Sequence, residues 1–528
     1  GANNGNNGAN NGNNGANNGG MEAVTWYKDI KPLMDRNCAG CHTDGGVGGF
    51  ALETYSEVTA LNQAVRDAVE SGTMPPWLPA EDCREFEGER RLTAAQIEAI
   101  GTWIDTAMPE GDPADDPQVV RPPTTLENPD LILRAAQPYT ANPDRSDDYR
   151  CLVLDHDFDR DTYLSAYQVV PDQRAIVHHV LFYLVPAAEV ERLDDLEAED
   201  AEPGYRCFGG PRAGDLLGTV AGWVPGSVPT HYPEDSAYVI PAGSKIVMQV
   251  HYNLLVGEPR ADRTEIHLRT LDTPPSNQIK ILPIPDFELN LPAGEARARE
   301  GATYPNIFGK TLLLVGTAPH MHMLGTEIRA RVNSSRGSEC IVDIPDYDFA
   351  WQQFYEFKPD SYIEFAPGDS VSVECIYDNS SSNQPVVNGE QLEPRDVEWG
   401  DGSLDEMCLL YLTTMEPFEG VSTCGNFADC NDDCDPNDGA CTLSCVSNGG
   451  GDCRQCGLFG LGECAVNRCG NVAESTLPCL LGCLQQPDVG VCLSNSCPAQ
   501  LDSLWSCLGP AFYDGQCNGQ VQDCGLAQ

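Results

Sequence analysis

The pattern of hydrophobic and polar residues changes along the chain, and each change predicts a different kind of structure. Across residues 26–113 apolar residues recur at helical spacing, for example at Ile30, Leu33 and Met34. The segment 93–104, TAAQIEAIGTWI, has the pattern of an amphipathic helix and opens on a threonine, a residue type that caps helix N-termini. We therefore expect a small helical domain in this part of the chain.

From about residue 131 to residue 415 the sequence pattern is typical of β-strands. Runs such as 175–184, AIVHHVLFYL, and 244–252, SKIVMQVHY, are rich in β-branched and aromatic residues, and turn clusters separate them. Short strands between frequent turns are typical of antiparallel sandwiches. The length allows two sandwiches, with a break near residues 272–276, DTPPS.

The two ends of the chain have unusual compositions. Residues 1–20, GANNGNNGANNGNNGANNGG, form a Gly/Asn repeat that cannot supply a core. We interpret this repeat as a flexible spacer left after removal of a leader. The sequence leaves open whether a lipid anchor lies upstream of it. From Cys424 onward there are sixteen cysteines in about a hundred residues. This density predicts a disulfide-stapled module whose connectivity the sequence does not give.

These patterns predict a multidomain protein, since a single core rarely grows beyond about 250 to 300 residues. The expected fold class is an all-α domain, two all-β jelly-roll-like sandwiches and a disulfide-rich C-terminal module. The expected boundaries are 1–20 for the spacer, 21–113 for the helical domain, 114–275 and 276–420 for the sandwiches, and 421–528 for the Cys-rich module.

The net charge and the cysteine content indicate which partners and which cellular compartment to expect. The formal net charge of −49 disfavours nucleic acid and anionic membrane surfaces as partners. The 24 cysteines favour an oxidising compartment. The longest apolar run, 175–188, is too short to span a bilayer and is interrupted by His178 and His179, so no transmembrane segment is expected. We expect an extracytoplasmic protein, in the periplasm, at the cell surface or secreted.

The sequence Cys38-Ala-Gly-Cys41-His42 has the spacing of a c-type haem attachment site. Two thiols at this spacing reach both vinyl groups of one haem, while the next histidine meets the iron. The alternatives are a C-x-x-C redox pair and half of a zinc site. The motif predicts one covalently bound haem c held by Cys38, Cys41 and His42.

The second axial ligand of this haem is less directly encoded. Met74, in the proline-stiffened loop TMPPW, is the expected ligand, and Met34 and Met108 are the competitors. The whole segment 21–113 resembles a monohaem class I cytochrome c, in which the distal methionine follows the haem motif at such a distance.

A second set of candidate ligands lies in the strand-rich region. In a strand, alternate side chains share a face, so the two histidines of the motif His320-Met-His322 can bind one ion together. The adjacent His178 and His179 would face opposite ways, so sharing an ion requires a bulge or a turn. Imidazoles suit copper and zinc, and a thioether shifts the choice toward Cu(I). The candidates are His178, His179, His251, His320, His322 and Met407.

Taken in order, these motifs resemble the copper type II, ascorbate-dependent monooxygenases, the family of peptidylglycine α-hydroxylating and dopamine β-monooxygenases. The resemblance spans roughly residues 130–420 and includes the segments 222–226, GWVPG, and 406–408, EMC. It implies two sandwiches facing each other across a solvent-filled cleft and two copper ions. His178, His179 and His251 would hold the electron-transfer copper, and the oxygen-activating copper would be held by His320, His322 and Met407.

The resemblance implies hydroxylation of a C–H bond of a small-molecule substrate with dioxygen, and His320, His322 and Met407 would be the catalytic ligands. Animal members take their two electrons from ascorbate. Here the fused haem is expected to supply or relay them, with an external reductant or redox protein upstream, because tethering raises its effective concentration. The alternatives are a haem that serves another partner, a non-catalytic haem and copper electron carrier, and a surface interaction protein that uses the Cys-rich module for recognition.

The resemblance also implies disulfides and a substrate class. It pairs Cys151 with Cys207 and Cys375 with Cys408; Cys83 is left over as a structural cysteine, and Cys340 is unassigned, with Cys424 as a candidate partner.

Peptide-amidating members hold a substrate carboxylate with an arginine before the HxH motif and an asparagine after the Met-Cys pair. This chain has Ala318 and Leu409 there, although Tyr411 fits the family pattern. The loss of both polar anchors favours a neutral or aromatic small molecule. The remaining histidines of this region, His156 and His231 and His267, match no ligand motif and are expected to be ordinary core or surface residues.

Overall fold

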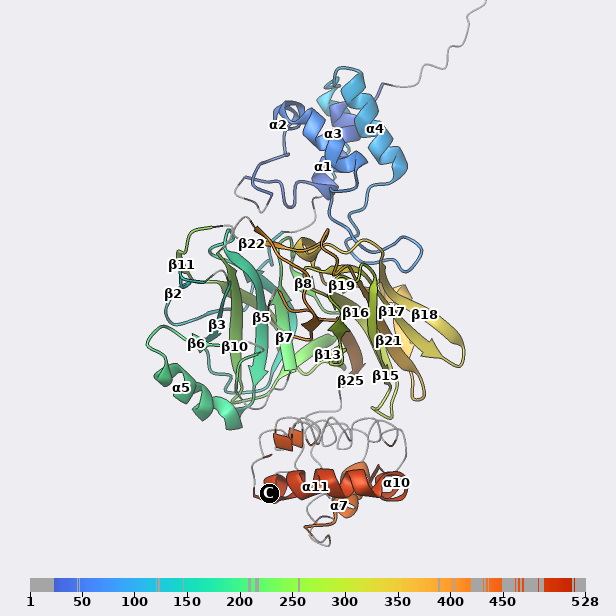
Figure 1. The fold of residues 1–528 in the computed structure, drawn as a ribbon. Helices are drawn as coiled ribbons and strands as arrows, with labels where there is room; N and C mark the ends of the chain where they lie inside the picture. The colour runs from blue at the N-terminus through green and yellow to red at the C-terminus, as the bar shows by residue number, and fades with distance from the viewer. Residues whose placement is uncertain are drawn as a thin grey trace, which may run out of the picture. The chain divides into compact units, whose positions relative to one another are not determined.

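The computed structural model describes two parts of the chain. The first is residues 23–418, apart from 45, 47, 120, 122–123, 146, 208–209, 214–217, 255–256, 388–389, 401 and 403; the second is residues 431, 434, 436–448, 461, 464–465, 468–469, 483, 489–514 and 517. The chain divides into two compact units (Figure 1). Residues 1–75 and 91–122 form the first, here called the helical unit, and residues 76–90 and 123–528 form the second, here called the β unit.

The helical unit contains only helices and turns among its described residues. Its helices are a π-helical turn η1 (Trp26–Ile30), α1 (Lys31–Asn37), α2 (Tyr55–Ala60), α3 (Asn62–Glu70), α4 (Ala94–Asp105) and the 3-10 turn η2 (Pro113–Asp115). The predicted helix over residues 93–104 is confirmed as α4, and the Thr93 side chain caps it in a reciprocal capping box with Gln96. Trp26, Ile30 and Trp103 form the centre of the small core.

The β unit is built around one sheet of ten strands (Figure 1). These strands are β1 (Leu131–Arg134), β4 (Thr162–Val170), β8 (Thr230–His231), β9 (Ser236–Ile240), β12 (Glu265–Leu271), β13 (Asn277–Pro285), β16 (Leu312–His320), β19 (Tyr355–Glu356), β20 (Ile363–Phe365) and β25 (Leu409–Pro417). The order along its main path is β1-β12-β4-β9-β13-β25-β16-β19, with β8 beside β4 and β20 beside β16.

Two smaller sheets complete the sandwiches. The first has the order β6-β3-β10-β5-β7, and its strands are β3 (Asp147–Val153), β5 (Val177–Val185), β6 (Tyr205–Arg206), β7 (Gly218–Trp223) and β10 (Lys245–Asn253). The second has the order β15-β21-β17-β18, and its strands are β15 (Ala298–Pro305), β17 (Gly325–Ser334), β18 (Gly337–Ile344) and β21 (Ser370–Tyr377). Each sheet encloses a separate apolar core against its half of the large sheet.

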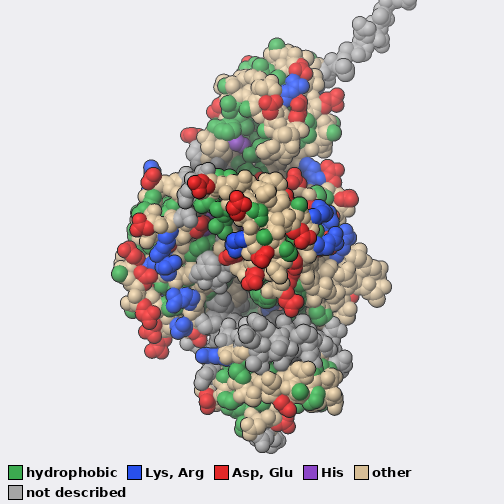
Figure 2. All heavy atoms as spheres, in the orientation of Figure 1, with side chains coloured by type: hydrophobic (Ala, Val, Ile, Leu, Met, Phe, Trp, Pro, Cys, Tyr) green, Lys and Arg blue, Asp and Glu red, His purple; other side chains and the backbone are tan. Residues whose placement is uncertain are grey.

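Short elements connect the main strands. Three two-stranded ribbons pair β2 (Tyr139–Thr140) with β11 (Ala261–Asp262), β14 (Asn290–Leu291) with β24 (Val397–Glu398), and β22 (Val386–Val387) with β23 (Glu390–Gln391). The short helices are η3 (Ala187–Glu189), α5 (Val190–Glu199), η4 (Phe349–Trp351) and η5 (Pro359–Ser361). On the face drawn in Figure 2, acidic side chains are scattered among smaller groups of Lys and Arg.

The predicted β-sandwich architecture is confirmed. The two halves also share one sheet, which the sequence pattern does not predict. Strand β9 of the first half pairs in parallel with β13 of the second, in the register Asn277 with Ser236 and Ile279 with Tyr238. The loop 272–276, where a break was expected, leads directly into this pairing. The halves are therefore joined by backbone hydrogen bonds as well as by the chain.

Residues 76–90 leave the helical unit and pack against the second sandwich. A disulfide joins Cys83 to Cys340 of β18. Phe86 is 1% exposed and forms an isolated bridge with Phe357. Cys83 is therefore not a leftover cysteine, and Cys340 pairs with it, not with Cys424, which lies outside the described residues. These fifteen residues lie inside the segment 21–113, for which one helical domain is predicted, but they group with the β unit.

The other two disulfides of the sandwiches agree with the resemblance. Cys151 pairs with Cys207 and Cys375 pairs with Cys408, which confirms both expectations. Within the described residues, no helix is long and apolar enough to cross a membrane.

The described part of the C-terminal module is helical and cross-linked, as the cysteine density predicts. Its described helices are α7 (Gly439–Asn448), α10 (Val489–Ser496) and α11 (Pro498–Tyr513). Trp505 and Phe512 of α11 lie in a small core with several half-cystines. The disulfides described there join Cys434 to Cys441, Cys464 to Cys517, Cys469 to Cys507 and Cys483 to Cys492.

Candidate metal centres

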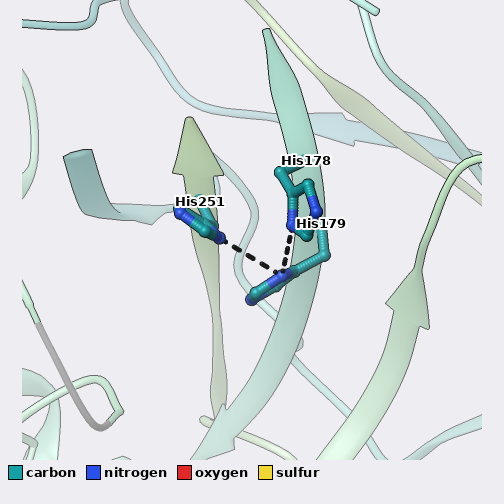
Figure 3. A group of neighbouring side chains, drawn as sticks. All are labelled: His178, His179 and His251. Carbon is teal, nitrogen blue, oxygen red and sulfur yellow. Dashed lines mark hydrogen bonds between the residues drawn. The ribbon is translucent and has the colours of Figure 1, made fainter. Parts of the chain in front are cut away.

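Three of the predicted histidines meet on two neighbouring strands of the first sandwich. His178 and His179 lie on β5 and His251 lies on β10 (Figure 3). The pairing of these strands matches His251 with His179, and the next residue, Tyr252, with Val177. His178 is therefore the extra residue of a β-bulge, which is the irregularity that two adjacent histidines need to face one ion.

The three imidazoles converge through their Nδ1 atoms. The Nδ1 of His179 lies 3.3 Å from that of His178 and 3.4 Å from that of His251. One ligand atom from each residue lies within 4.8 Å of the others. Nitrogen atoms at these separations can bind a single transition-metal ion.

Asp147 and Tyr149 of β3 fix the orientation of the His251 ring. Its Nε2 lies 2.8 Å from Oδ1 of Asp147 on β3, and its ring stacks on Tyr149 at 4.2 Å. Because a carboxylate only accepts hydrogen bonds, Nε2 carries a proton, and Nδ1 is the nitrogen that faces the cluster. A histidine held by a carboxylate in this way is typical of metal ligands.

The electrostatics of the cluster keep the rings of His178 and His179 uncharged. Burial, reinforced by the neighbouring histidines, lowers the pKa of His178 to about 4. The same causes hold the pKa of His179 well below its ordinary value. Neutral imidazoles are the form that binds a metal ion, so the donor set fits copper.

The HxH motif forms a second histidine group at the end of β16 in the second sandwich. His320 is the last residue of the strand and His322 follows it, and their ring centroids lie 5.0 Å apart. Nδ1 of His320 lies 2.6 Å from the amide oxygen of Gln352, and Nδ1 of His322 lies 3.0 Å from the carbonyl oxygen of Asp405. Both partners are acceptors, so Nδ1 carries the proton in each ring and Nε2 is left for a metal.

Burial also keeps this second pair neutral. It lowers the pKa of His320 to about 4 and that of His322 to about 3. Between them, Met321 turns the other way into the core and is fully buried. The hydroxyl of Tyr347 accepts a hydrogen bond from the Met321 N–H and donates one to its carbonyl, which holds the turn.

The carboxyl group of Glu406 joins the HxH motif to the segment that carries Met407. Its Oε2 accepts hydrogen bonds from the backbone N–H groups of His322 and Met407, at 2.8 and 3.3 Å, and its Oε1 accepts one from Leu324 at 2.6 Å. Burial raises the pKa of Glu406 to about 8, although these backbone donors act in the opposite direction. The backbones of His322 and Met407 are thus brought together, while the role of the thioether as a ligand stays a prediction.

Met407 itself is fixed by its neighbours. It is 8% exposed, its carbonyl accepts a hydrogen bond from the Tyr377 hydroxyl at 2.8 Å, and the adjacent Cys408 is tied to Cys375. Sequence reasoning missed the orienting residues Asp147, Gln352 and Glu406. Only Glu406, beside Met407, could have drawn attention.

One aromatic side chain contacts both histidine groups. The ring of Phe349 in η4 stacks on His178 with centroids 5.1 Å apart and meets His322 edge to face at 6.0 Å. The two groups come from different sandwiches, so the fold places them on either side of one phenylalanine.

The haem motif lies at the end of α1 in the helical unit. The N–H groups of Cys41 and His42 both donate to the carbonyl of Cys38, at 3.1 and 2.9 Å, which folds the motif into a turn. Among the described residues, Cys38 and Cys41 are the free cysteines. Nδ1 of His42 lies 3.3 Å from the carbonyl oxygen of Phe50, which leaves Nε2 available. Covalent attachment of a c-type haem requires two free thiols, and its iron requires an available imidazole nitrogen, so the residues present fit this group.

The methionine candidates occupy different places in this unit. Met34 is 1% exposed in the core, and Met108 packs against that core. Met74 is partly buried and lies next to the point where the chain leaves the helical unit. The assignment of Met74 as an axial ligand stays a prediction.

Comparison with known proteins gives a match over the second sandwich. Residues 300–433 match the model of the copper type II ascorbate-dependent monooxygenase C-terminal domain. The protein MOXD1 homolog 2 of Drosophila melanogaster is 24% identical over 262 residues, which cover 44% of this chain and 33% of that protein. The chain thus spans about a third of the length of this relative. Both matches support a copper-dependent monooxygenase-like protein.

The likeness to solved structures is weaker. The major capsid protein P2 of bacteriophage PM2 matches with a TM-score of 0.25 and 8% identity, covering 55% of this chain and 98% of that chain. A TM-score this low carries no argument about fold or function.

Proposed function

We propose that this protein is a copper-dependent monooxygenase that hydroxylates a C–H bond of a small molecule and takes its electrons from a covalently bound haem c. The observation that carries the proposal is the pair of histidine groups, each with metal-facing nitrogens left unprotonated by their hydrogen bonds. The reaction inserts one oxygen atom of dioxygen into substrate and reduces the other to water, with consumption of two electrons and two protons.

The two groups have different parts in this proposal. His178, His179 and His251 would hold one copper ion through imidazoles alone. His320, His322 and Met407 would hold the other, where a thioether favours Cu(I). Copper bound at these sites would supply one-electron redox chemistry and the activation of dioxygen.

The protein's own residues would keep these donors ready. Asp147, Gln352 and the Asp405 carbonyl orient three of the rings. Burial keeps His178, His179, His320 and His322 from being protonated. Orienting partners of this kind commonly change metal affinity by about 10- to 100-fold when removed.

The substrate class follows from the residues beside the second group. Ala318 and Leu409 stand where peptide-amidating relatives would have polar anchors, and the pairing of β16 with β25 sets Ala318 opposite Tyr411 and Leu409 opposite His320. Apolar side chains give a substrate carboxylate no partner. We infer a neutral or aromatic small molecule.

The haem would be held by Cys38 and Cys41 through thioether bonds and by His42 and Met74 as axial ligands. It would pass electrons one at a time, and its attachment to the same chain would raise its effective concentration. An external reductant or redox protein would refill it. The disulfides favour an oxidising, extracytoplasmic compartment.

Metal analysis and labelled dioxygen test the monooxygenase proposal. We expect two coppers per chain after reconstitution and one atom of ¹⁸O from ¹⁸O₂ in the product of a screen of small aromatic compounds. Met407→Leu keeps the side-chain volume and removes the sulfur, so it should fold normally and lose hydroxylation. A protein that binds less than one copper, or a Met407→Leu variant with full activity, would refute the proposal.

The haem has a separate test. Reduced protein should show a c-type spectrum that survives denaturation, and Cys41→Ser should weaken this covalent attachment. Mixing reduced protein with dioxygen and substrate should reoxidise the haem faster with copper than without it. Equal rates would mean that the haem serves another partner.

A further inference from the structure

A cavity lies in the β unit, at the junction of the two sandwiches. It has a volume of about 300 Å³, which is within the range of small-molecule sites. Its walls come from β4 and β8 of the first half, from β16, β19 and β25 of the second, and from the segment 76–90. Figure 1 places β8, β16 and β19 beside one another in the middle of the unit. None of the predicted copper ligands lines this cavity.

The walls of the cavity are aromatic and its charge is negative. Tyr167, Tyr232, Phe354 and Tyr362 are among the lining residues, and the rings of Tyr167 and Tyr232 lie 6.2 Å apart. The acidic lining residues are Glu87 and Glu356, and the lining contains no lysine or arginine. His231 also lines it, and burial lowers the pKa of this imidazole, so it does not offset the two acids at neutral pH.

Glu356 is the central acid of this cavity. It lies on β19 opposite Gly316 of β16, and its side chain is partly buried. Within the described residues no basic side chain forms an ion pair with it, and the carboxylate instead faces a second acid, Glu87. Burial and this like charge raise the pKa of Glu356 to about 7. Burial and a like charge destabilise an ionised carboxylate that has no basic partner. A cation beside the Glu356 carboxylate would offset this destabilisation.

The wall that carries Glu87 is held in place covalently. The Glu87 N–H donates a hydrogen bond to the Glu356 carbonyl at 2.8 Å. Four residues earlier, the Cys83–Cys340 disulfide ties the same segment to β18. One wall of the cavity thus comes from a segment that contributes none of the proposed copper ligands.

We propose that this cavity binds a small organic cation of the alkylammonium class, with the Glu356 carboxylate as its counter-charge and the tyrosine rings as its walls. Aromatic faces attract ammonium groups, most strongly where water is excluded. A hard metal ion would need six or more oxygen ligands, which these walls do not supply. The inference does not depend on the proposed monooxygenase activity.

Calorimetry on the full chain tests this proposal with a matched pair of ligands. Choline and 3,3-dimethylbutan-1-ol have nearly the same shape, but only choline is charged. We expect choline to bind at least about tenfold more tightly than the alcohol, a ratio that corresponds to one ion-pair contact. Equal affinities, or no saturable binding of either choline or tetramethylammonium, would overturn the proposal.

Two variants separate a loss of charge from a loss of fold. Glu356→Gln should lower choline affinity by about tenfold or more and leave that of the alcohol unchanged. Tyr232→Leu should weaken both ligands, because it removes a wall. The control Glu398→Gln changes an exposed acid outside the cavity and should bind choline as the unmodified chain does. If Glu356→Gln folds with an unchanged circular dichroism spectrum and keeps its choline affinity, the proposal is wrong.

Discussion

The carboxyl group of Glu406 accepts a hydrogen bond from the backbone N–H of His322 at 2.8 Å, across 84 residues of sequence. The same oxygen accepts the N–H of Met407, and the other oxygen accepts that of Leu324. The Glu406 side chain therefore fixes the turn that follows β16 against the segment that precedes β25.

Replacing Glu406 by alanine should destabilise the protein. The change leaves buried backbone N–H groups of His322, Leu324 and Met407 without acceptors, and each unsatisfied group costs about 1 to 3 kcal/mol. We expect the free energy of unfolding to fall by at least about 3 kcal/mol, measured by urea denaturation. An unchanged midpoint would show that water replaces the carboxyl group.

Copper stoichiometry should respond to single histidines. His251→Ala and His320→Ala should each lower the copper content from two to one per chain, because each removes a ligand from a different group. His267→Ala is the control, since His267 lies on β12 and pairs with Glu265. If neither ligand variant loses copper on elemental analysis, the metals lie elsewhere.

The Asp147 carboxylate should affect copper affinity at the three-histidine site and not at the other site. Asp147→Ala removes the acceptor that fixes the proton on Nε2 of His251, so copper affinity there should drop by about 10- to 100-fold. Titration against a competing chelator measures this loss. Affinity at the His320 and His322 site should not change, and an equal drop at both sites would indicate a general structural effect.

The disulfide between Cys83 and Cys340 should contribute strongly to stability. It closes a loop of 257 residues, for which the chain-entropy formula gives about 5.5 kcal/mol. The double variant Cys83→Ala/Cys340→Ala should show a lower denaturation midpoint and faster proteolysis within residues 76–90. Cleavage at the unmodified rate would mean that packing alone fixes the segment.

Glu356 should make stability depend on pH in an unusual direction. Its pKa is about 7 in the folded protein, against an ordinary 4.5, so between these values the folded chain keeps a proton that the unfolded chain has released. This contribution to the free energy of unfolding therefore falls as pH rises from about 4.5 to about 7. Glu356→Gln removes it, so the variant should gain stability relative to the unmodified chain at about pH 8 and not at about pH 4, as urea midpoints will show.

Local features of the fold could be predicted because they depend on neighbouring residues. Thr93 marks the start of α4, and runs of β-branched and aromatic residues predict β5 and β10. The adjacent His178 and His179 required a bulge, and the register of β5 against β10 contains one.

Features set by distant residues could not be predicted. The parallel pairing of β9 with β13 and the disulfide of Cys83 join segments whose proximity no local pattern encodes. The candidate ligands could be named from motifs in order, whereas the protonated nitrogen of each ring is set by Asp147, Gln352 and Asp405, which lie far away in sequence.

The disulfide of Cys83 also constrains the order of events during synthesis. Chains emerge from the ribosome N-terminus first, so Cys83 appears 257 residues before its partner Cys340. Cys38 and Cys41 lie N-terminal to Cys83, and Cys151 and Cys207 also emerge before Cys340. Correct pairing therefore requires Cys38 and Cys41, which are free in the folded protein, to be kept out of competition. If the proposed haem c is attached there, its thioether bonds would do so, and chains made without haem would accumulate scrambled disulfides.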